Sequence, residues 1–405
     1  MGWKETCAMS ERVKFMAAWL EGHETRTALC ERFGISRKTG YKWASRHGAE
    51  PGAGFSDRSR APRRIPHRLS DPVAARIVAL RRENPRWGPR KLRAVLRERH
   101  PELCVPAAST IGDLLRREGL VVGRRRRHRP LSQPGPFAAV TAANDTWCID
   151  FKGWFRTGDG RRCDPLTVSD AHSRYLLACV IVPPTEAGVR PVVEELLRRC
   201  GLPKAIRSDN GPPFASAGAG GLSHLSAHWL KLGIRLERIE PGCPEQNGRH
   251  ERLHRTLKAE TAAPPAADAP AQQARFDVFR RRYNEERPHE ALGQVPPARL
   301  WRKSRRRYPK RIADPVYPAK EAVRRVRSNG EIKFGGELIY VSEALIGEAV
   351  GIAETESGDW LVRFADLNLG FIDRRTGKLR RFAAPRPGRR KANPIPESVT
   401  HPPGP

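Results

Sequence analysis

The chain has 405 residues, and its 75 Lys and Arg outnumber 44 Asp and Glu to give a formal net charge of +31 at pH 7. No stretch approaches the roughly 18 apolar residues of a membrane span, and the segment MGWKETCAMSERVK at the start lacks the apolar core of a signal peptide. Composition therefore excludes a membrane partner, and we expect a cytoplasmic protein that associates with the nucleoid.

Positive charge is concentrated in three runs, at 59–64, 124–130 and 301–307. Such runs favour binding to phosphate backbones by counterion release over a merely solvated basic surface. The eight cysteines are scattered, without a C-x-x-C pair or the paired His spacing of a zinc module. We therefore expect buried free thiols and no zinc domain.

Residues 10–47, within a predicted domain 1–48, have the pattern of a helix-turn-helix. Ser10 is the expected cap of a first helix that ends at Gly22, Thr25 caps a second helix, and 36–47 form the recognition helix. An ordinary three-helix bundle with a basic face fits almost equally well. Gly40 argues against an uninterrupted third helix, because glycine costs about 1 kcal/mol relative to alanine. The residues expected to contact DNA are Ser36, Arg37, Lys38, Thr39 and Lys42.

A linker rich in Pro, Gly and Arg follows at 49–68, and its Arg63 and Arg64 are expected to track a DNA groove. A second helix-turn-helix-like module spans 69–122, with helices at 71–83, 89–99 and 107–118. Ser109 and Thr110 open the last of these helices and are expected to contact DNA. A basic linker covers 123–144.

From residue 145 strands alternate with helices. The pattern predicts strands at 147–155, 166–170, 174–182, 205–208 and 234–239, and helices at 185–200, 222–232 and from Gly248 onward. An α/β domain over 145–300 follows from this alternation.

Three acids in this domain lie in distinctive surroundings: Asp150 in TWCIDFKGW, Asp209 in IRSDNGPPF and Glu251 in PGCPEQNGRHERLHRTLK. Asp150 lies in an apolar strand, where a carboxylate is costly unless it binds a partner or a metal. Three carboxylates brought together by a fold supply the oxygen ligands that hard divalent cations need.

These motifs resemble those of the DDE transposases of the insertion-sequence type and of retroviral-type integrases, over about residues 140–300. The resemblance implies an RNase H-like catalytic core in which Asp150, Asp209 and Glu251 are catalytic and bind two Mg²⁺ ions, with Mn²⁺ able to substitute. It also implies that Lys258, seven residues after the glutamate, contacts donor DNA. The alternative is that Lys258 is an ordinary exposed lysine without a binding role. We expect DNA contacts from Asn210, Asn247 and His254 as well.

Each acid has a rival reading. Asp209-Asn210-Gly211 is a favourable turn in any protein, and Asp164 and Asp170 compete with Asp150 from a predicted hairpin. Glu245 follows Asp209 after 35 intervening residues, the spacing of retroviral integrases, whereas Glu251 follows after 41. We favour Glu251, because it lies on a helix and Glu245 lies in a proline-flanked loop; the insertion GAGG at 218–221 accounts for the longer interval.

The segment YNEERPHEALG at 283–293 resembles the exit from the catalytic domain of this family. A basic linker is predicted at 301–318, a small SH3-like β-barrel at 319–383 from its short apolar runs and turns, and a disordered tail at 384–405.

The sequence thus predicts a multidomain protein with N-terminal all-α helix-turn-helix modules, a central α/β RNase H-like core and a C-terminal β-barrel. The expected function is a transposase that binds element-end DNA and catalyses Mg²⁺-dependent 3′-end cleavage and strand transfer into target DNA, as a homo-oligomer, either a dimer or a tetramer. Two alternatives stay open: a DNA-binding regulator with an inactive core, and an RNase H-like nuclease that does not join strands.

Overall fold

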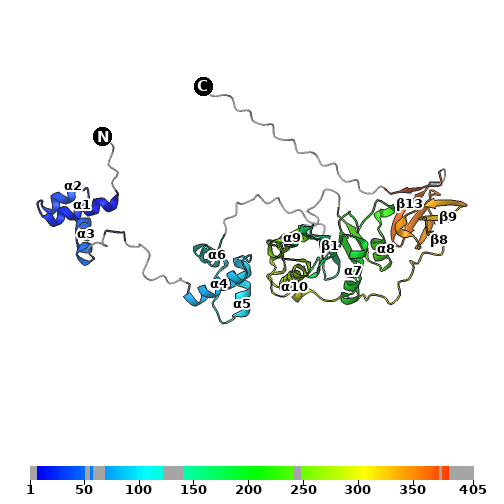
Figure 1. Ribbon diagram of the computed structural model, residues 1–405, viewed down its shortest axis with the longest axis horizontal. Helices are drawn as coiled ribbons and strands as arrows, with labels where there is room; N and C mark the ends of the chain where they lie inside the picture. Colours follow the sequence, from blue (N-terminus) through cyan, green and yellow to red (C-terminus); the bar gives the residue numbers. More distant parts are fainter. Residues whose placement is uncertain are drawn as a thin grey trace, which may run out of the picture. The chain divides into compact units, whose positions relative to one another are not determined.

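The computed structural model describes residues 7–50, 55–57, 69–121, 140–239, 248–373 and 376–382 (Figure 1). The chain divides into two compact units, 1–70 and 71–405, which are described separately. Within the described residues, no helix combines the length and the apolar character that crossing a membrane requires.

The first unit contains three helices: α1 (Ala8–Glu21), α2 (Arg26–Arg32) and α3 (Arg37–Ala49). Their shared core contains Phe15, Leu29 and Trp43. Gly22 ends α1 in the left-handed conformation and Thr25 caps α2, as predicted. Ser10 is not the cap of α1, because the helix begins earlier and the Sγ atom of Cys7 accepts the backbone N–H of Ser10.

Helix α3 runs without interruption through Gly40, contrary to the expectation from glycine's low helix propensity. A Cβ at this position would lie 2.7 Å from the Cys30 sulfur and 3.1 Å from Phe15 Cζ. Glycine is present because α3 crosses α1 and α2 at this point, and the close approach outweighs its local cost.

The second unit opens with α4 (Asp71–Glu83), α5 (Pro89–Arg99) and α6 (Ala108–Arg117). Each of these helices buries an apolar side chain completely, at Ile77, Leu92 and Ile111 respectively. The bounds of α4 and α5 are those that the capping pattern predicts.

A five-stranded sheet follows, in the order β5 (Leu176–Ile181), β4 (Pro165–Asp170), β1 (Thr146–Phe151), β6 (Ala205–Ser208) and β7 (Arg235–Arg238). The first three strands pair antiparallel, and β6 and β7 extend the sheet in parallel with β1. A short hairpin, β2 (Phe155–Arg156) with β3 (Arg162–Cys163), interrupts the connection from β1 to β4.

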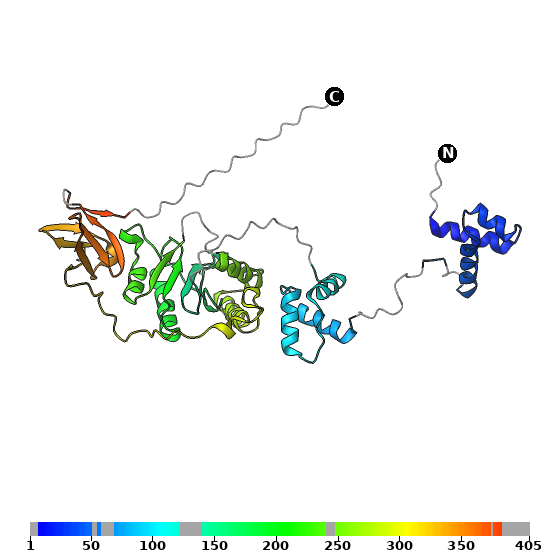
Figure 2. The same ribbon diagram turned by 180° about the vertical axis from the view of Figure 1, so that it is seen from behind.

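Helices cover both faces of this sheet (Figures 1 and 2). Helices α7 (Glu186–Cys200) and α8 (His224–Lys231) contribute Val193 and Trp229 to the core on one face. Helices α9 (Gly248–Thr261) and α10 (Ala269–Glu285) pack Leu253 and Phe276 against the other. Because side chains alternate along a strand, Trp147 and Ile149 of β1 enter the first layer and Asp150 belongs to the face that α9 covers.

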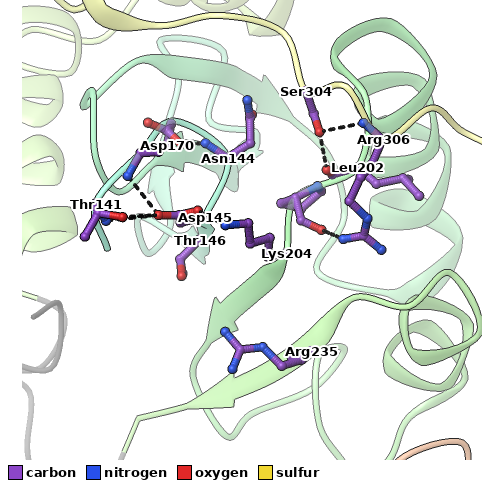
Figure 3. A network of polar contacts seen from close by, with 12 residues as sticks. Thr141, Asn144, Asp145, Thr146, Asp170, Leu202, Lys204, Arg235, Ser304 and Arg306 are labelled. Atoms are coloured by element: carbon purple, nitrogen blue, oxygen red, sulfur yellow. Dashed lines mark hydrogen bonds and ion pairs between the residues drawn. The ribbon is translucent and has the colours of Figure 1, made fainter. Parts of the chain in front are cut away.

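Two short helices, η3 (Glu290–Leu292, 3-10) and α11 (Pro297–Leu300), lead to the segment predicted as a basic linker. This segment is bound to the core. Ser304 Oγ donates to the Leu202 carbonyl at 2.7 Å (Figure 3). The Arg306 guanidinium donates to the carbonyl of Pro203 at 2.6 Å. Trp301, Tyr308 and Ile312 pack against the core.

The C-terminal strands form an open antiparallel sheet rather than the predicted barrel. Its strands, in spatial order, are β14 (Leu379–Arg381), β13 (Leu367–Ile372), β12 (Trp360–Phe364), β11 (Ala349–Glu354) and β8 (Ala322–Arg325). A separate hairpin contains β9 (Glu331–Phe334) and β10 (Glu337–Tyr340), followed by the 3-10 turn η4 (Glu343–Leu345).

Among the described residues, β8 and β14 do not pair, so a closed barrel is not confirmed. Residues from outside the sheet pack against its apolar face instead. Ala219 of the 3-10 turn η1 (Ala219–Gly221), Leu222, and Ala227 of α8 join the same core as Val362 and Leu369. The domain built on the β5-β4-β1-β6-β7 sheet therefore supplies the packing that closure of the C-terminal sheet on itself would otherwise supply.

Candidate functional site

Asp150 lies near the end of β1, opposite Thr167 of β4. Its side chain is 23% exposed. Burial raises the pKa of this carboxyl to about 7, and the negative charge of Asp209 adds to the increase, with a smaller contribution from Glu251. Burial is the larger cause, and carboxyl groups shifted by burial and by a neighbouring charge are common at functional sites.

Asp209 follows directly after β6, the parallel neighbour of β1, so both acids lie at the same end of the sheet. The Gly211 N–H donates to its Oδ1 atom at 3.3 Å. Arg238 of β7 secures the following loop by donating to the carbonyls of Phe214 and Gly221. Partial burial raises the pKa of the Asp209 carboxyl, and Arg238 opposes the increase.

Glu251 lies in the first turn of α9 with its side chain exposed. Its negative charge adds a small part to the raised pKa of Asp150, and α9, which carries Glu251, packs on the face of the sheet to which Asp150 belongs. The rival Glu245 lies outside the described residues.

The two rivals of Asp150 have other partners. Asp164 forms a bidentate pair with Arg162, with both N–O distances at 2.7 Å. Asp170 is buried and accepts a hydrogen bond from the Asn144 N–H, which fixes the segment before β1 to the end of β4 (Figure 3). It also accepts hydrogen bonds from the N–H and hydroxyl of Ser173. Neither carboxylate is directed to the group of three acids.

The spacing of Glu251, His254 and Lys258 predicts one helix face, but Glu251 and Lys258 are exposed and His254 is buried. It is 8% exposed, and its Nε2 atom lies 2.7 Å from Thr167 Oγ1. Burial leaves little of the His254 side chain accessible to DNA, and its contact with DNA stays a prediction. His250 was missed, although the buried residues of α9, which include His250, Leu253, His254 and Leu257, have the spacing of one helix face. That spacing was the available signal.

A basic rim borders the acids. Lys152, just after β1, lies close enough to Lys258 for the second charge to add to the lowering of its pKa that burial causes. The exposed Trp154 has the guanidinium groups of Arg156 and Arg162 over its ring, at 5.8 and 5.4 Å. Lys152 and Trp154 belong to the motif around Asp150, but the sequence alone did not distinguish them.

The other residues predicted to bind DNA lie as follows. Ser36 caps α3 by accepting the Thr39 N–H, and Arg37, Lys38 and Lys42 are exposed on that helix. In the first turn of α6, Ser109 is exposed and Thr110 is half-buried.

Asn210 is exposed and donates to the Ile239 carbonyl at 2.6 Å. Arg63, Arg64 and Asn247 lie outside the described residues.

Three domain families match parts of the chain. Residues 11–63 match a helix-turn-helix domain, 39–115 a homeodomain-like domain and 232–297 an integrase core domain. The integrase match includes Glu251. The helix-turn-helix and integrase domains imply that the protein binds DNA.

Two curated proteins of bacterial insertion elements are similar over most of their length. The IS476 39.2 kDa protein of Xanthomonas euvesicatoria is 30% identical over 70% of this chain and 79% of its own length. The IS407 31.7 kDa protein of Burkholderia multivorans is 30% identical over 59% of this chain and 84% of its own length. Among solved structures, the catalytic core domain of HTLV-2 integrase in complex with magnesium matches 39% of this chain and 97% of its own, at 15% identity and a TM-score of 0.32.

Proposed function

Because this chain belongs to the insertion-element transposases that carry an integrase core, we propose that it nicks the 3′ ends of its element and joins them to target DNA, with Asp150, Asp209 and Glu251 as catalytic residues. The observation that supports the proposal is that Asp150 and Asp209 lie at the same end of the adjacent parallel strands β1 and β6, while Glu251 lies in the first turn of α9, which packs on the face of Asp150.

The donor set fits divalent metal ions. Carboxylate oxygens are the preferred ligands of Mg²⁺ and Mn²⁺, and three acids that repel one another are stabilised when cations bind between them. When bound, two such ions supply Lewis-acid stabilisation of the attacking and leaving oxygens at phosphorus. Asp150, Asp209 and Glu251 would hold them.

The remaining residues position DNA. Lys152 and Lys258 place positive charge beside the acids, where phosphates of the DNA end would lie, and Trp154 offers an exposed ring for stacking on a base. Element ends are bound by the helix-turn-helix region through Arg37, Lys38, Thr39 and Lys42, with Ser36 at its cap. The active form is a homo-oligomer on DNA, which allows two ends to be joined together.

A Mg²⁺-dependent assay on terminal-repeat DNA tests the proposal. Asp150→Asn, Asp209→Asn and Glu251→Gln each remove one anionic ligand at nearly constant volume. We expect each variant to lose at least about 100-fold in nicking and joining, because several kcal/mol of transition-state stabilisation are lost. DNA binding, measured by gel shift, should change little.

Glu245→Gln is the matched control and should keep most of its activity. An active Glu251→Gln beside an inactive Glu245→Gln would reverse the assignment of the third acid. Nicked products without joined products would indicate the nuclease, and a wild-type chain that binds ends without nicking them would indicate the regulator.

A further inference from the structure

Beneath Asp150 lies a buried polar cluster that the proposed reaction does not use. Thr167 Oγ1 lies 2.6 Å from His250 Nε2, 2.7 Å from His254 Nε2 and 3.1 Å from the Asp150 carbonyl oxygen. His250 Nδ1 lies 3.1 Å from Ser169 Oγ. Thr167, Ser169, His250 and His254 are all buried, so their protons must be shared within the cluster.

The positions of these protons follow from the hydrogen-bond network. A hydroxyl has one proton to donate, and the Asp150 carbonyl can only accept, so Thr167 donates to that carbonyl. Both histidines must then donate to Thr167 from Nε2. His250 Nδ1 accepts from Ser169, which leaves both nitrogens of His250 engaged.

The same assignment leaves a nitrogen lone pair on His254 Nδ1, and this atom lies 4.0 Å from Asp150 Oδ2. Two electron-pair donors this close in a partly buried site are stabilised when a cation binds both of them. Metal bonds to imidazole nitrogen and carboxylate oxygen are about 2.0–2.2 Å long, so one ion can span this separation. Within the described residues, Asp150, His250 and His254 together offer donor atoms within 4.8 Å of one another.

We propose that His254 Nδ1 is a nitrogen ligand, beside Asp150, of one of the divalent ions in the acid site. The inference rests on the proposed function and adds a ligand to it. His250 is not assigned as a ligand, because Thr167 and Ser169 engage both of its ring nitrogens.

A nitrogen donor changes which metal the site prefers. Mg²⁺ favours oxygen ligands and keeps its water, whereas affinity for nitrogen donors rises from Mn²⁺ toward the later divalent metals. The chain should therefore bind Mn²⁺ and Co²⁺ more tightly than Mg²⁺, by a margin that depends on His254.

The test is electron spin echo envelope modulation of Mn²⁺ bound to the full chain. We expect modulation from a directly bound imidazole nitrogen, and its frequencies should change when the protein is grown with ¹⁵N-histidine. This measurement requires no variant. Bound Mn²⁺ without nitrogen modulation would overturn the inference and leave the proposed function standing, while absence of Mn²⁺ binding would count against both.

Variants then identify the histidine. His254→Gln keeps an amide N–H that can donate to Thr167 but removes the nitrogen lone pair, so the modulation should disappear. Mn²⁺ affinity should fall by about tenfold or more, with a smaller loss for Mg²⁺. His250→Gln is the matched control and should keep the modulation, and circular dichroism should show both variants folded. Modulation that survives in His254→Gln would contradict the assignment.

Discussion

At the scale of single residues, Asp150 combines a strand position, partial burial and two acidic neighbours. The pKa of its carboxyl is about 7, against 3.8 for an ordinary aspartate. Between pH 3.8 and about pH 7, the Asp150 carboxyl is protonated in the folded protein and ionised in the unfolded chain. Stability of the metal-free protein therefore falls as the pH rises through this window.

Asp150→Asn removes this dependence. In EDTA, the variant should gain stability relative to the wild type as the pH rises from 4 to 8, by an amount on the order of 2–4 kcal/mol. Urea unfolding at several pH values measures the difference. Mg²⁺ added at pH 8 should stabilise the wild type more than the variant. A stability difference that does not vary with pH would contradict the shifted pKa.

The sequence predicted the strand of Asp150, the turn after β6 and the helix of Glu251, because local periodicity and capping determine those elements. It did not predict the cluster under Asp150. Thr167 reaches the histidines only through the register of β4 against β1 and the packing of α9 on that face, and these contacts join residues that are distant in sequence.

At the scale of elements, α3 shows how packing outweighs propensity. Gly40→Ala would improve the intrinsic helix propensity of α3 by about 1 kcal/mol. It would also press a methyl group against Cys30 and Phe15. Overpacking of this kind typically costs about 1–3 kcal/mol, so we expect a net loss of stability in the first unit.

Gly48 provides the control on the same helix. A Cβ at Gly48 meets nothing within 4 Å, so Gly48→Ala should be neutral or stabilising. Limited proteolysis within residues 1–50 of the full chain, followed by mass spectrometry, compares the two variants. Equal protection in Gly40→Ala and Gly48→Ala would show that α3 has more room than the structure indicates.

For the C-terminal region, the sequence predicted the strands but not the residues that pack against them. Their alternation and turns identified a small β domain, but alternation shows only that each strand has an apolar face. It does not show whether that face is covered by the same sheet or by another element, and here η1 and α8 cover it.

At the scale of the whole chain, the C-terminal sheet completes the second unit. Leu222 and Ala227 lie in its core, and Lys231 pairs with Glu348 at 2.6 Å and with Asp314 at 3.3 Å. A chain that ends at residue 318 should expose this apolar surface, bind a hydrophobic dye and unfold at lower temperature than the full chain.

The control is a chain that ends at residue 383, which keeps every described strand and should match the full chain in dye binding and unfolding temperature. If the shorter chain matched it as well, the sheet would have to be an independent domain and the shared core would be wrong.

The loop that begins at Asp209 also contains η1, where a Cβ on Gly220 would lie 2.9 Å from Leu367 of β13. During translation, Asp209 leaves the ribosome long before Leu367. The loop therefore reaches its final packing only after nearly the whole protein has been made. A nascent chain, or one cut short by a premature stop codon, would lack this support for its second acid. We therefore expect the proposed cleavage of DNA to require synthesis of the chain through the C-terminal sheet, so that truncated products that lack β13 are inactive.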